Sequence, residues 1–196
     1  MVLKKFASLL CLIAMLIGTS TALAENETAI FAGGCFWCLQ ADFDKIPGVI
    51  STTVGYDGGS TPNPSYSKVS SGKTNYVESV KVIYDTEKVS YQQLLTTFWH
   101  NIDPLDKGGQ FCDRGKQYRS AIFYLNQQQY QMAQDSKEAV KKKLAKTVYT
   151  NILPSTQFYP AEAYHQKYYK NHSIRYKFYR LRCGRDKRLK EIWGES

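Results

Sequence analysis

The chain has 196 residues and a formal net charge of +9, from 26 Lys and Arg against 17 Asp and Glu. This length supports one domain with its own hydrophobic core, so the fold does not need disulfides to hold it together. A positive charge can indicate a nucleic-acid or anionic-membrane partner. The basic residues gather at 141–143 and 175–190 without a nucleic-acid-binding motif, and we therefore expect no nucleic-acid partner.

The first 24 residues have the pattern of a secretory signal peptide. Lys4-Lys5 precede an apolar run at 6–18, and Ala22-Leu23-Ala24 has the small residues of a cleavage site. The apolar run is shorter than the roughly 18 residues of a membrane span. We expect cleavage to leave residues 25–196 as a single catalytic domain. The mature protein is expected to be exported, to a bacterial periplasm, without stable insertion in the membrane.

Hydrophobic periodicity predicts a βαββαβ series in the order strand 27–32, helix 35–45, strand 49–56, strand 77–84, helix 90–101 and strand 119–125. This order is that of the ferredoxin-like split βαβ unit. A helix at 127–146 and a strand near 148–153 extend it. We therefore expect an α+β fold with a ferredoxin-like core and a mixed sheet. From Phe158 onward, a long irregular C-terminal arm rich in tyrosine is expected.

The first predicted strand leads into Gly33-Gly34-Cys35-Phe36-Trp37-Cys38, where two glycines allow a sharp turn into a helix. Cys35 is therefore expected at a helix N-terminus. Unpaired N–H groups and the helix dipole lower a thiol pKa there and favour a nucleophilic thiolate. Phe36 and Trp37 would line an apolar pocket beside it. The sequence predicts sulfur chemistry at Cys35.

Glu78 is the second candidate, at the start of a predicted strand. Strand alternation places it on the same face as Val80, Val82 and Tyr84. Burial on an apolar face raises a carboxyl pKa, so the group can stay protonated near neutral pH and act as a general acid. The alternative is a solvated Glu78 at a frayed strand end.

Three further candidates lie in irregular segments at 57–76 and 103–118 or at their edges. Tyr56 and Tyr118 are hydroxyl donors at junctions between loops and strands, where sites are commonly built. Each could equally be a packing residue. Asp113 could orient a substrate amide or form a turn within its own loop.

Four cysteines follow the signal segment: Cys35, Cys38, Cys112 and Cys183. In an oxidising compartment they could form two structural disulfides, with three possible pairings. The Cys35-x-x-Cys38 spacing also matches redox and metal sites, but no second ligand pair exists, so we expect no metal. Cys112 is taken as an untouched thiol in a polar loop. Cys183, beside Gly184 in the tail, is better placed to resolve an oxidised partner.

Together these motifs resemble the A-class peptide-methionine (S)-sulfoxide reductases, from Phe31 to about Trp193. The matching segments are Gly34-Cys35-Phe36-Trp37, Val54-Gly55-Tyr56 with Gly58-Gly59, Thr61-Pro62-Asn63-Pro64-Ser65-Tyr66, Glu78, Phe98-Trp99, Asp103-Pro104, Gly115-x-Gln117-Tyr118-Arg119-Ser120-Ala121-Ile122 and Phe158-Tyr159-x-Ala161-Glu162-x-Tyr164-His165-Gln166.

The resemblance implies a role for each candidate in reducing the S epimer of methionine sulfoxide, free or in oxidised proteins under repair. Cys35 attacks the sulfoxide sulfur and becomes a sulfenic acid. Glu78 donates a proton to the oxygen, and Tyr56 and Tyr118 hydrogen-bond that oxygen. The residues expected to hold the substrate are Phe36, Trp37 and Asp113.

The resemblance also implies how the enzyme is regenerated. A second thiol condenses with the sulfenic acid, and a thioredoxin-like protein reduces the resulting disulfide. Cys183 is favoured over Cys38 and Cys112 as that thiol. Neither metal nor organic cofactor is implied, and we expect a monomer. One departure is Gln40, where many family members have glutamate, which affects only a local hydrogen bond.

Three other functions remain open. A periplasmic thiol–disulfide oxidoreductase would use Cys35 and Cys38 directly, without Glu78. A basic, tyrosine-rich binding module would have structural cysteines only. A cysteine hydrolase would pair Cys35 with His165, although a clear orienting partner is missing.

Overall fold

The computed structural model describes residues 26–194 of the chain. The predicted signal peptide, residues 1–24, lies outside the described residues. Within residues 26–194, every helix is too short or too polar to cross a lipid bilayer.

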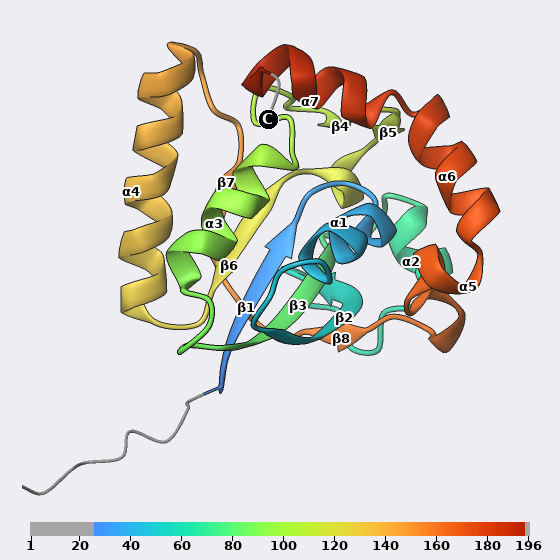
Figure 1. The fold of residues 1–196 in the computed structure, drawn as a ribbon. Coiled ribbons are helices and arrows are strands. Elements are labelled where there is room, and N and C mark those ends of the chain that lie inside the picture. Colours follow the sequence, from blue (N-terminus) through green and yellow to red (C-terminus); the bar gives the residue numbers. More distant parts are fainter. Residues whose placement is uncertain (1–25, 195–196) are drawn as a thin grey trace, which may run out of the picture.

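The centre of the fold is a six-stranded sheet in the order β7-β6-β1-β3-β2-β8 (Figure 1). Its strands are β1 (Asn26–Ala32), β2 (Val49–Asp57), β3 (Val77–Asp85), β6 (Ala121–Tyr124), β7 (Asn151–Pro154) and β8 (Tyr159–Pro160). The pair β6–β7 is parallel, and the other pairs are antiparallel. The predicted mixed sheet in an α+β fold is confirmed.

The main helices of the core are α1 (Phe36–Phe43), α3 (Tyr91–His100) and α4 (Gln127–Leu144). In Figure 1, α1 and α3 lie across the strands, and α4 stands beside α3. Ser90 begins α3 as predicted: its hydroxyl accepts from Gln93 N–H, and the Gln93 side chain accepts from Ser90 N–H. This reciprocal capping satisfies two backbone donors that a helix start leaves free.

Aromatic side chains from three elements form the core beside α1. Phe31 of β1 stacks with Phe43 of α1 and with Phe98 of α3, with ring centroids 5.0 and 5.2 Å apart. All three side chains are fully buried. The first stack packs α1 against β1, so the start of α1 is positioned at the end of that strand.

The two segments predicted to be irregular contain short elements. Residues 57–76 include α2 (Tyr66–Ser70), and residues 103–118 include a two-stranded sheet of β4 (Gly109–Gln110) and β5 (Asp113–Arg114), followed by a 3₁₀ turn (Lys116–Tyr118). Both segments bring side chains to the region around the start of α1.

The prediction of a long irregular C-terminal arm is wrong. After a 3₁₀ turn (Ala163–His165), the chain forms α5 (Tyr168–Asn171), α6 (Ser173–Arg182) and α7 (Arg185–Trp193). Gly184, at φ +67°, allows the bend between α6 and α7. The docked side of α6 is formed by polar and aromatic side chains, whereas its apolar residues at helical spacing, Ile174, Phe178 and Leu181, are exposed.

Buried Arg185 attaches α7 to the body of the fold. Its guanidinium donates to the carbonyl oxygens of Gly33 and Asn101 and lies over the ring of Phe111, 4.5 Å from the centroid. Gly33 directly follows β1, so α7 is tied to the loop that leads into α1 (Figure 1).

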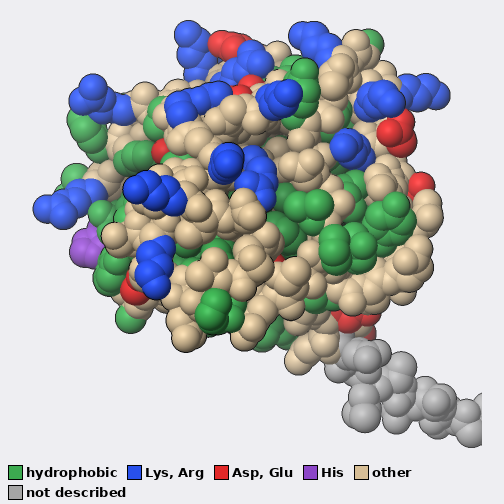
Figure 2. Space-filling model, turned by 180° about the vertical axis from the view of Figure 1, so that it is seen from behind, with side chains coloured by type: hydrophobic (Ala, Val, Ile, Leu, Met, Phe, Trp, Pro, Cys, Tyr) green, Lys and Arg blue, Asp and Glu red, His purple; other side chains and the backbone are tan. Residues whose placement is uncertain are grey.

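Basic side chains are distributed over the surface. On the face in Figure 2, Lys and Arg are scattered among polar and apolar groups instead of forming one continuous strip. The triplet Lys141 to Lys143 is exposed in the last turn of α4. Cations at that end of a helix interact favourably with its dipole, so the triplet has a local structural explanation.

Candidate active site

Cys35 is the N-cap residue of α1, as the sequence predicts. It follows Gly34, whose φ of +80° favours glycine. A Cβ at Gly34 would also lie 2.5 Å from Gln110 Cβ, too close for any other residue without movement. The Gly-Cys pair therefore fixes the start of the helix against the loop that contains β4.

The expectation of a lowered Cys35 pKa is wrong for this state of the protein. Cys35 is only 4% exposed, and burial raises the pKa of its thiol well above the ordinary value. The adjacent Cys38 thiol and the charges of Glu78 and Asp113 act in the same direction. Loss of solvation thus outweighs the helix N-terminus, and Cys35 is a neutral thiol at neutral pH.

Glu78 is buried as predicted, with 3% of its surface exposed. It pairs with Tyr56 in the β2–β3 register, and its Oε2 accepts a hydrogen bond of 3.1 Å from Phe36 N–H. Burial raises the pKa of Glu78 to about 8, although the Phe36 hydrogen bond opposes the rise. The solvated alternative is excluded, and the carboxyl group is mostly protonated at neutral pH.

Cys35 and Glu78 line the same small cavity of about 80 Å³. Its walls are formed by Cys35, Phe36, Trp37, Tyr66, Glu78, Asp113, Tyr118 and Tyr179. The structure thus brings together six of the eight predicted site residues. Tyr56 and Cys183 are not part of the wall. Larger hollows exist, such as one of about 820 Å³ between α3 and α7, but the residues lining it include no cysteine.

Two tyrosines in the wall were missed as site residues. Tyr66 begins α2 and lines the cavity together with Tyr118. Burial raises the pKa of Tyr66 to about 12 and also raises that of Tyr118, so both remain proton donors. Tyr66 belongs to the Thr61–Tyr66 motif, which was a usable signal. Tyr179, in a segment predicted to be irregular, gave none.

Within the protein, the Tyr56 hydroxyl has Glu162 as its partner. This buried hydroxyl donates to Glu162 Oε2 at 2.9 Å, and Glu162 Oε1 accepts from Tyr66 N–H at 2.8 Å. Glu162 therefore connects β2 with the start of α2. Tyr56 lies beside Glu78 in the β2–β3 pair, and its hydroxyl is hydrogen-bonded to Glu162.

Asp113 joins three parts of the site. Its Oδ2 accepts from the Tyr179 hydroxyl of α6, and its side chain lines the same cavity as Cys35. Burial raises the pKa of Asp113, whereas the Tyr179 hydrogen bond and the charge of Arg185 oppose the rise. Asp113 thus connects the β4–β5 sheet with α6 at the wall of the cavity that contains the nucleophile.

Trp37 is held in place by His165. The indole Nε1–H donates to His165 Nδ1 at 3.2 Å, and the ring of Tyr168 stacks on the indole at 3.9 Å. Burial lowers the pKa of His165, which favours the neutral form that accepts this bond. His165 is a support for the pocket wall, and this bonding gives no support to a hydrolase pair with Cys35.

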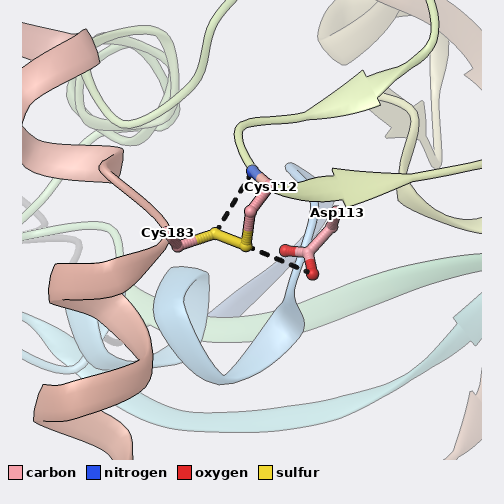
Figure 3. Close-up of side chains that lie close together, drawn as sticks. All are labelled: Cys112, Asp113 and Cys183. Carbon is pink, nitrogen blue, oxygen red and sulfur yellow. Dashed lines mark hydrogen bonds between the residues drawn. A yellow bond between two sulfur atoms is a disulfide. The ribbon is translucent and has the colours of Figure 1, made fainter.

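The four cysteines among residues 26–194 form one disulfide and one free pair. Cys112 and Cys183, 71 residues apart in the chain, are bonded (Figure 3), whereas Cys35 and Cys38 are free and buried. The interpretation of Cys112 as an untouched thiol is therefore wrong. Cys112 N–H donates to Cys183 Sγ at 3.2 Å, and Cys112 Sγ lies 3.9 Å from Asp113 Oδ1.

Among residues 26–194, Cys112, Asp113 and Cys183 also form the one cluster with the spacing of a metal site. In this structure, its two sulfurs are joined to each other and do not offer thiolate ligands. The arrangement is that of a redox pair beside Cys35.

Gln40 is fully buried and makes two hydrogen bonds. Its Nε2 donates to Thr52 O at 3.3 Å, and its Oε1 accepts from Lys167 N–H at 2.8 Å. The amide supplies both the donor and the acceptor, whereas an ionised glutamate has no hydrogen to donate. Gln40 therefore links α1 to β2 and to the start of the C-terminal helices.

Sequence comparison places these features in a known family. The family model described as "Peptide methionine sulfoxide reductase" matches residues 27–196. A relative from Caulobacter vibrioides, named peptide methionine sulfoxide reductase MsrA 2, is 46% identical over 184 residues, covering 93% of this chain and 94% of that protein. The MsrA of Bacillus subtilis is 44% identical, covering 87% of this chain and 97% of that protein.

Solved structures have the same fold. Methionine sulfoxide reductase A of Corynebacterium diphtheriae has a TM-score of 0.74 at 35% identity, covering 82% of this chain and 81% of that one. Reduced Mxr1 from Saccharomyces cerevisiae has a TM-score of 0.72 at 29% identity, covering 76% and 87%. With a buried thiol and a protonated carboxyl group on one cavity, the chain belongs to the peptide methionine sulfoxide reductase family, MsrA type.

Proposed function

We propose that this chain reduces the S epimer of methionine sulfoxide, using Cys35 as nucleophile and Glu78 as acid. The observation that carries this assignment is that both groups line one cavity, with Glu78 protonated at neutral pH because it is buried. A sulfoxide oxygen is a poor leaving group until it receives a proton, so nucleophile and acid must face the same substrate.

The first half-reaction moves one oxygen atom from substrate to enzyme. The Cys35 sulfur attacks the sulfoxide sulfur while Glu78 protonates the oxygen. The thiol proton of Cys35 then passes to the Glu78 carboxylate. The attack forms a transient bond between the two sulfurs; the hydroxyl group then passes to the Cys35 sulfur, so that the substrate S–O bond and the sulfur–sulfur bond break and an S–O bond to Cys35 forms. The net change is a thiol and a sulfoxide giving a sulfenic acid and a sulfide.

The cavity walls suggest how the substrate lies. The rings of Phe36 and Trp37 offer an apolar surface for the methyl group, and Trp37 is fixed by His165 and Tyr168. Tyr118 and Tyr66 line the cavity and are the proposed hydrogen-bond donors to the oxygen, and Glu162 links Tyr56 to the backbone of Tyr66. Asp113 lines the same cavity and accepts from Tyr179.

Regeneration would use the other two reactive cysteines in sequence. Cys183 attacks the Cys35 sulfenic acid, which forms a Cys35–Cys183 disulfide and releases water. Cys112 then attacks Cys183, which frees Cys35 as a thiol and forms the Cys112–Cys183 disulfide. This order is supported by the disulfide in the structure, which leaves Cys35 free for another substrate.

The Cys112–Cys183 disulfide needs two electrons from outside, for which a thioredoxin-like protein is suited. Yeast Mxr1 is known in a structure titled as a complex with Trx2, and that chain has a TM-score of 0.54 at 21% identity to this one. We infer a reductant of the same chemical type here. Free and protein-bound methionine sulfoxide are both candidate substrates.

We also infer that residues 1–24 direct export to a periplasm and that the mature protein is a monomer. Export is supported by the lysines, apolar run and small residues of that segment. N-terminal sequencing of the protein recovered from a bacterial periplasm tests the export proposal, since an uncleaved or cytoplasmic product contradicts it. Light scattering of the mature chain tests the oligomeric state.

For the fold type, we propose a ferredoxin-like core. It is supported by the antiparallel order β6-β1-β3-β2, in which β1-α1-β2 and β3-α3-β6 interleave.

The deciding experiment supplies separated S and R epimers of a blocked methionine sulfoxide with dithiothreitol. We expect sulfide from the S epimer alone, and none from the Cys35→Ser variant. No turnover of either epimer, together with rapid reduction of insulin disulfides, would favour the oxidoreductase that uses Cys35 and Cys38.

A further inference from the structure

Cys112, Asp113 and Cys183 come from separate parts of the chain and meet at one point (Figure 3). Cys112 precedes β5, Asp113 begins β5, and Cys183 is the C-cap of α6. The two Sγ atoms and one carboxylate oxygen all lie within 4.8 Å of one another. The sequence pattern Cys35-x-x-Cys38 does not include any of these three residues.

Reduction of the disulfide turns this cluster into a set of metal ligands. A dithiol reductant passes two electrons and two protons to the Cys112–Cys183 bond, which leaves one thiol on each residue. Two thiolates with one carboxylate suit Zn²⁺, whereas Mg²⁺ and Ca²⁺ take oxygen ligands. Three protein ligands leave the fourth tetrahedral position open to water.

The distances fit a tetrahedral zinc site after a small movement. Zn–S and Zn–O bonds of about 2.3 and 2.1 Å place a ligating sulfur and oxygen about 3.6 Å apart. Cys112 Sγ and Asp113 Oδ1 are 3.9 Å apart. The two sulfurs separate to about 3.8 Å in such a site, once their bond is broken. Their Cα atoms are 4.9 Å apart, so rotation about the Cα–Cβ bonds keeps both sulfurs within reach of one ion.

Hydrogen bonds already orient two of the three ligands. Asp113 Oδ2 accepts from the Tyr179 hydroxyl, which leaves Oδ1 to face Cys112 Sγ. Cys183 Sγ accepts from Cys112 N–H at 3.2 Å, and such a bond also stabilises a thiolate. Metal sites depend on partners of this kind, because they hold each ligand in the geometry that the ion requires.

Charge and access favour an ion at this cluster. Two thiolates and one carboxylate carry three negative charges, so a divalent cation leaves one, which the nearby positive charge of Arg185 offsets. Cys112 is exposed, whereas Asp113 and Cys183 are half-buried. An ion can therefore enter from solvent and still be held by side chains that have limited freedom.

We propose that Cys112, Asp113 and Cys183 of the reduced protein bind one Zn²⁺ ion, and that the disulfide abolishes this site. In the binding step, Zn²⁺ replaces the two thiol protons, which are released to water, and no electron moves. The site requires only that the disulfide be reduced, so it does not depend on the proposed function.

The ion and the disulfide compete for the same two sulfurs. A zinc-bound pair must release the ion before Cys112 and Cys183 can bond to each other, so zinc should hold the protein reduced. If the disulfide is the product of turnover, as proposed above, zinc also slows the regeneration of Cys35. That consequence alone rests on the proposed function.

The test measures metal binding directly, without any sulfoxide. Mature protein is reduced with dithiothreitol, separated from it without air and titrated with Co²⁺, whose bonds to thiolates absorb strongly in the near ultraviolet. Zn²⁺ then displaces the Co²⁺ in a competition titration. The ligand variants are Cys112→Ser, Asp113→Asn and Cys183→Ser. The matched control is Cys35→Ser with Cys38→Ser, which removes the other two thiols.

We expect one ion per reduced chain, none per oxidised chain, and normal binding in the control. Loss of either cysteine should weaken binding by about 100-fold or more, because a ligand is removed. Asp113→Asn, which keeps an oxygen without the charge, and Tyr179→Phe should each weaken it about 10- to 100-fold.

Four outcomes overturn the proposal. They are absence of binding by the reduced protein, equal binding by the oxidised protein, loss of binding in the control, and wild-type affinity in Asp113→Asn. The last result would mean that the carboxylate is not a ligand.

Alkylation locates the ion on the sulfurs independently. Iodoacetamide should label Cys112 and Cys183 about 10-fold more slowly in the zinc-loaded reduced protein than in the metal-free one, because the free thiolate is the nucleophile. Mass spectrometry of peptides measures the labelling of each cysteine. Equal labelling with and without zinc also overturns the proposal. A failure of the proposed reductase activity would leave these measurements unchanged.

Discussion

The backbone N–H of Phe36 donates to Glu78 Oε2 at 3.1 Å, so the residue after the nucleophile also holds the acid. One helix start thus positions both groups on the wall of one cavity. The bond favours the ionised carboxylate, yet burial still raises the pKa of Glu78 to about 8. The acid is therefore both fixed in place and protonated when substrate arrives.

Replacing this acid should slow the first half-reaction. In Glu78→Gln the amide keeps the shape of the side chain but has no acidic proton, and we expect methionine formation to fall about 10²- to 10⁴-fold. Single-turnover quench experiments without reductant measure this step directly. The wild-type rate should also fall as the pH rises above about 8 and Glu78 ionises, a dependence that Glu78→Gln should lack. Near-normal sulfide formation in the variant would remove Glu78 from the mechanism.

The same pKa shift predicts a dependence of stability on pH. Between pH 4.5 and about 8, the folded state keeps a proton on Glu78 that the unfolded state has lost. The contribution is fully present below pH 4.5 and is lost as the pH rises to about 8, at up to about 1.4 kcal/mol per pH unit.

Urea unfolding of the wild type and Glu78→Gln at several pH values isolates this contribution. The free energy of unfolding of the wild type should fall relative to that of the variant as the pH rises through this window. A constant difference between the two proteins would mean that the folded and unfolded states ionise Glu78 alike.

The order of the cysteine steps predicts different products in two single variants. With Cys112→Ser, one equivalent of sulfoxide should trap the Cys35–Cys183 disulfide, because the thiol that would attack it is missing. With Cys183→Ser, the reaction should stop at a Cys35 sulfenic acid that is 16 Da heavier than the thiol, about the mass of one oxygen. Mass spectrometry of peptides distinguishes these products. A Cys35–Cys112 or Cys35–Cys38 link in Cys183→Ser would show that another thiol resolves.

Gly34 should tolerate no side chain. Its φ of +80° is unfavourable for alanine, and the added Cβ would lie 2.5 Å from Gln110 Cβ. Gly184 is the matched control, since its φ is +67° but nothing lies within 4 Å of an added Cβ. We expect Gly184→Ala to cost about 1–2 kcal/mol of unfolding free energy for the left-handed backbone.

Gly34→Ala should cost about 1–3 kcal/mol beyond that amount, because the β4 loop must also move. Chemical denaturation of both variants gives the difference. Sulfide formation should be slower only in Gly34→Ala, because Cys35 is displaced in that variant. Equal unfolding free energies of Gly34→Ala and Gly184→Ala would mean that the loop containing Gln110 moves without loss of stability.

Local sequence patterns by themselves determined the nucleophile, the acid and most of the elements. Strand and helix periodicity in β1, α1 and β3 is decided within short segments, so the position of Cys35 at a helix start and the burial of Glu78 could be predicted. The resemblance to a family, carried by ordered motifs, predicted six of the residues around the cavity.

Only the tertiary structure decided what depends on contacts between distant segments. The Cys112–Cys183 bond joins residues 71 apart, and Tyr179 reaches Asp113 from the side of α6 opposite its exposed apolar residues. The Cys35 pKa was predicted in the wrong direction because the helix start is local, whereas burial is set by everything packed around it. The periodicity of a segment indicates which of its residues are buried. The pairing of distant cysteines and the loss of solvation around Cys35 depend on how all the segments pack together.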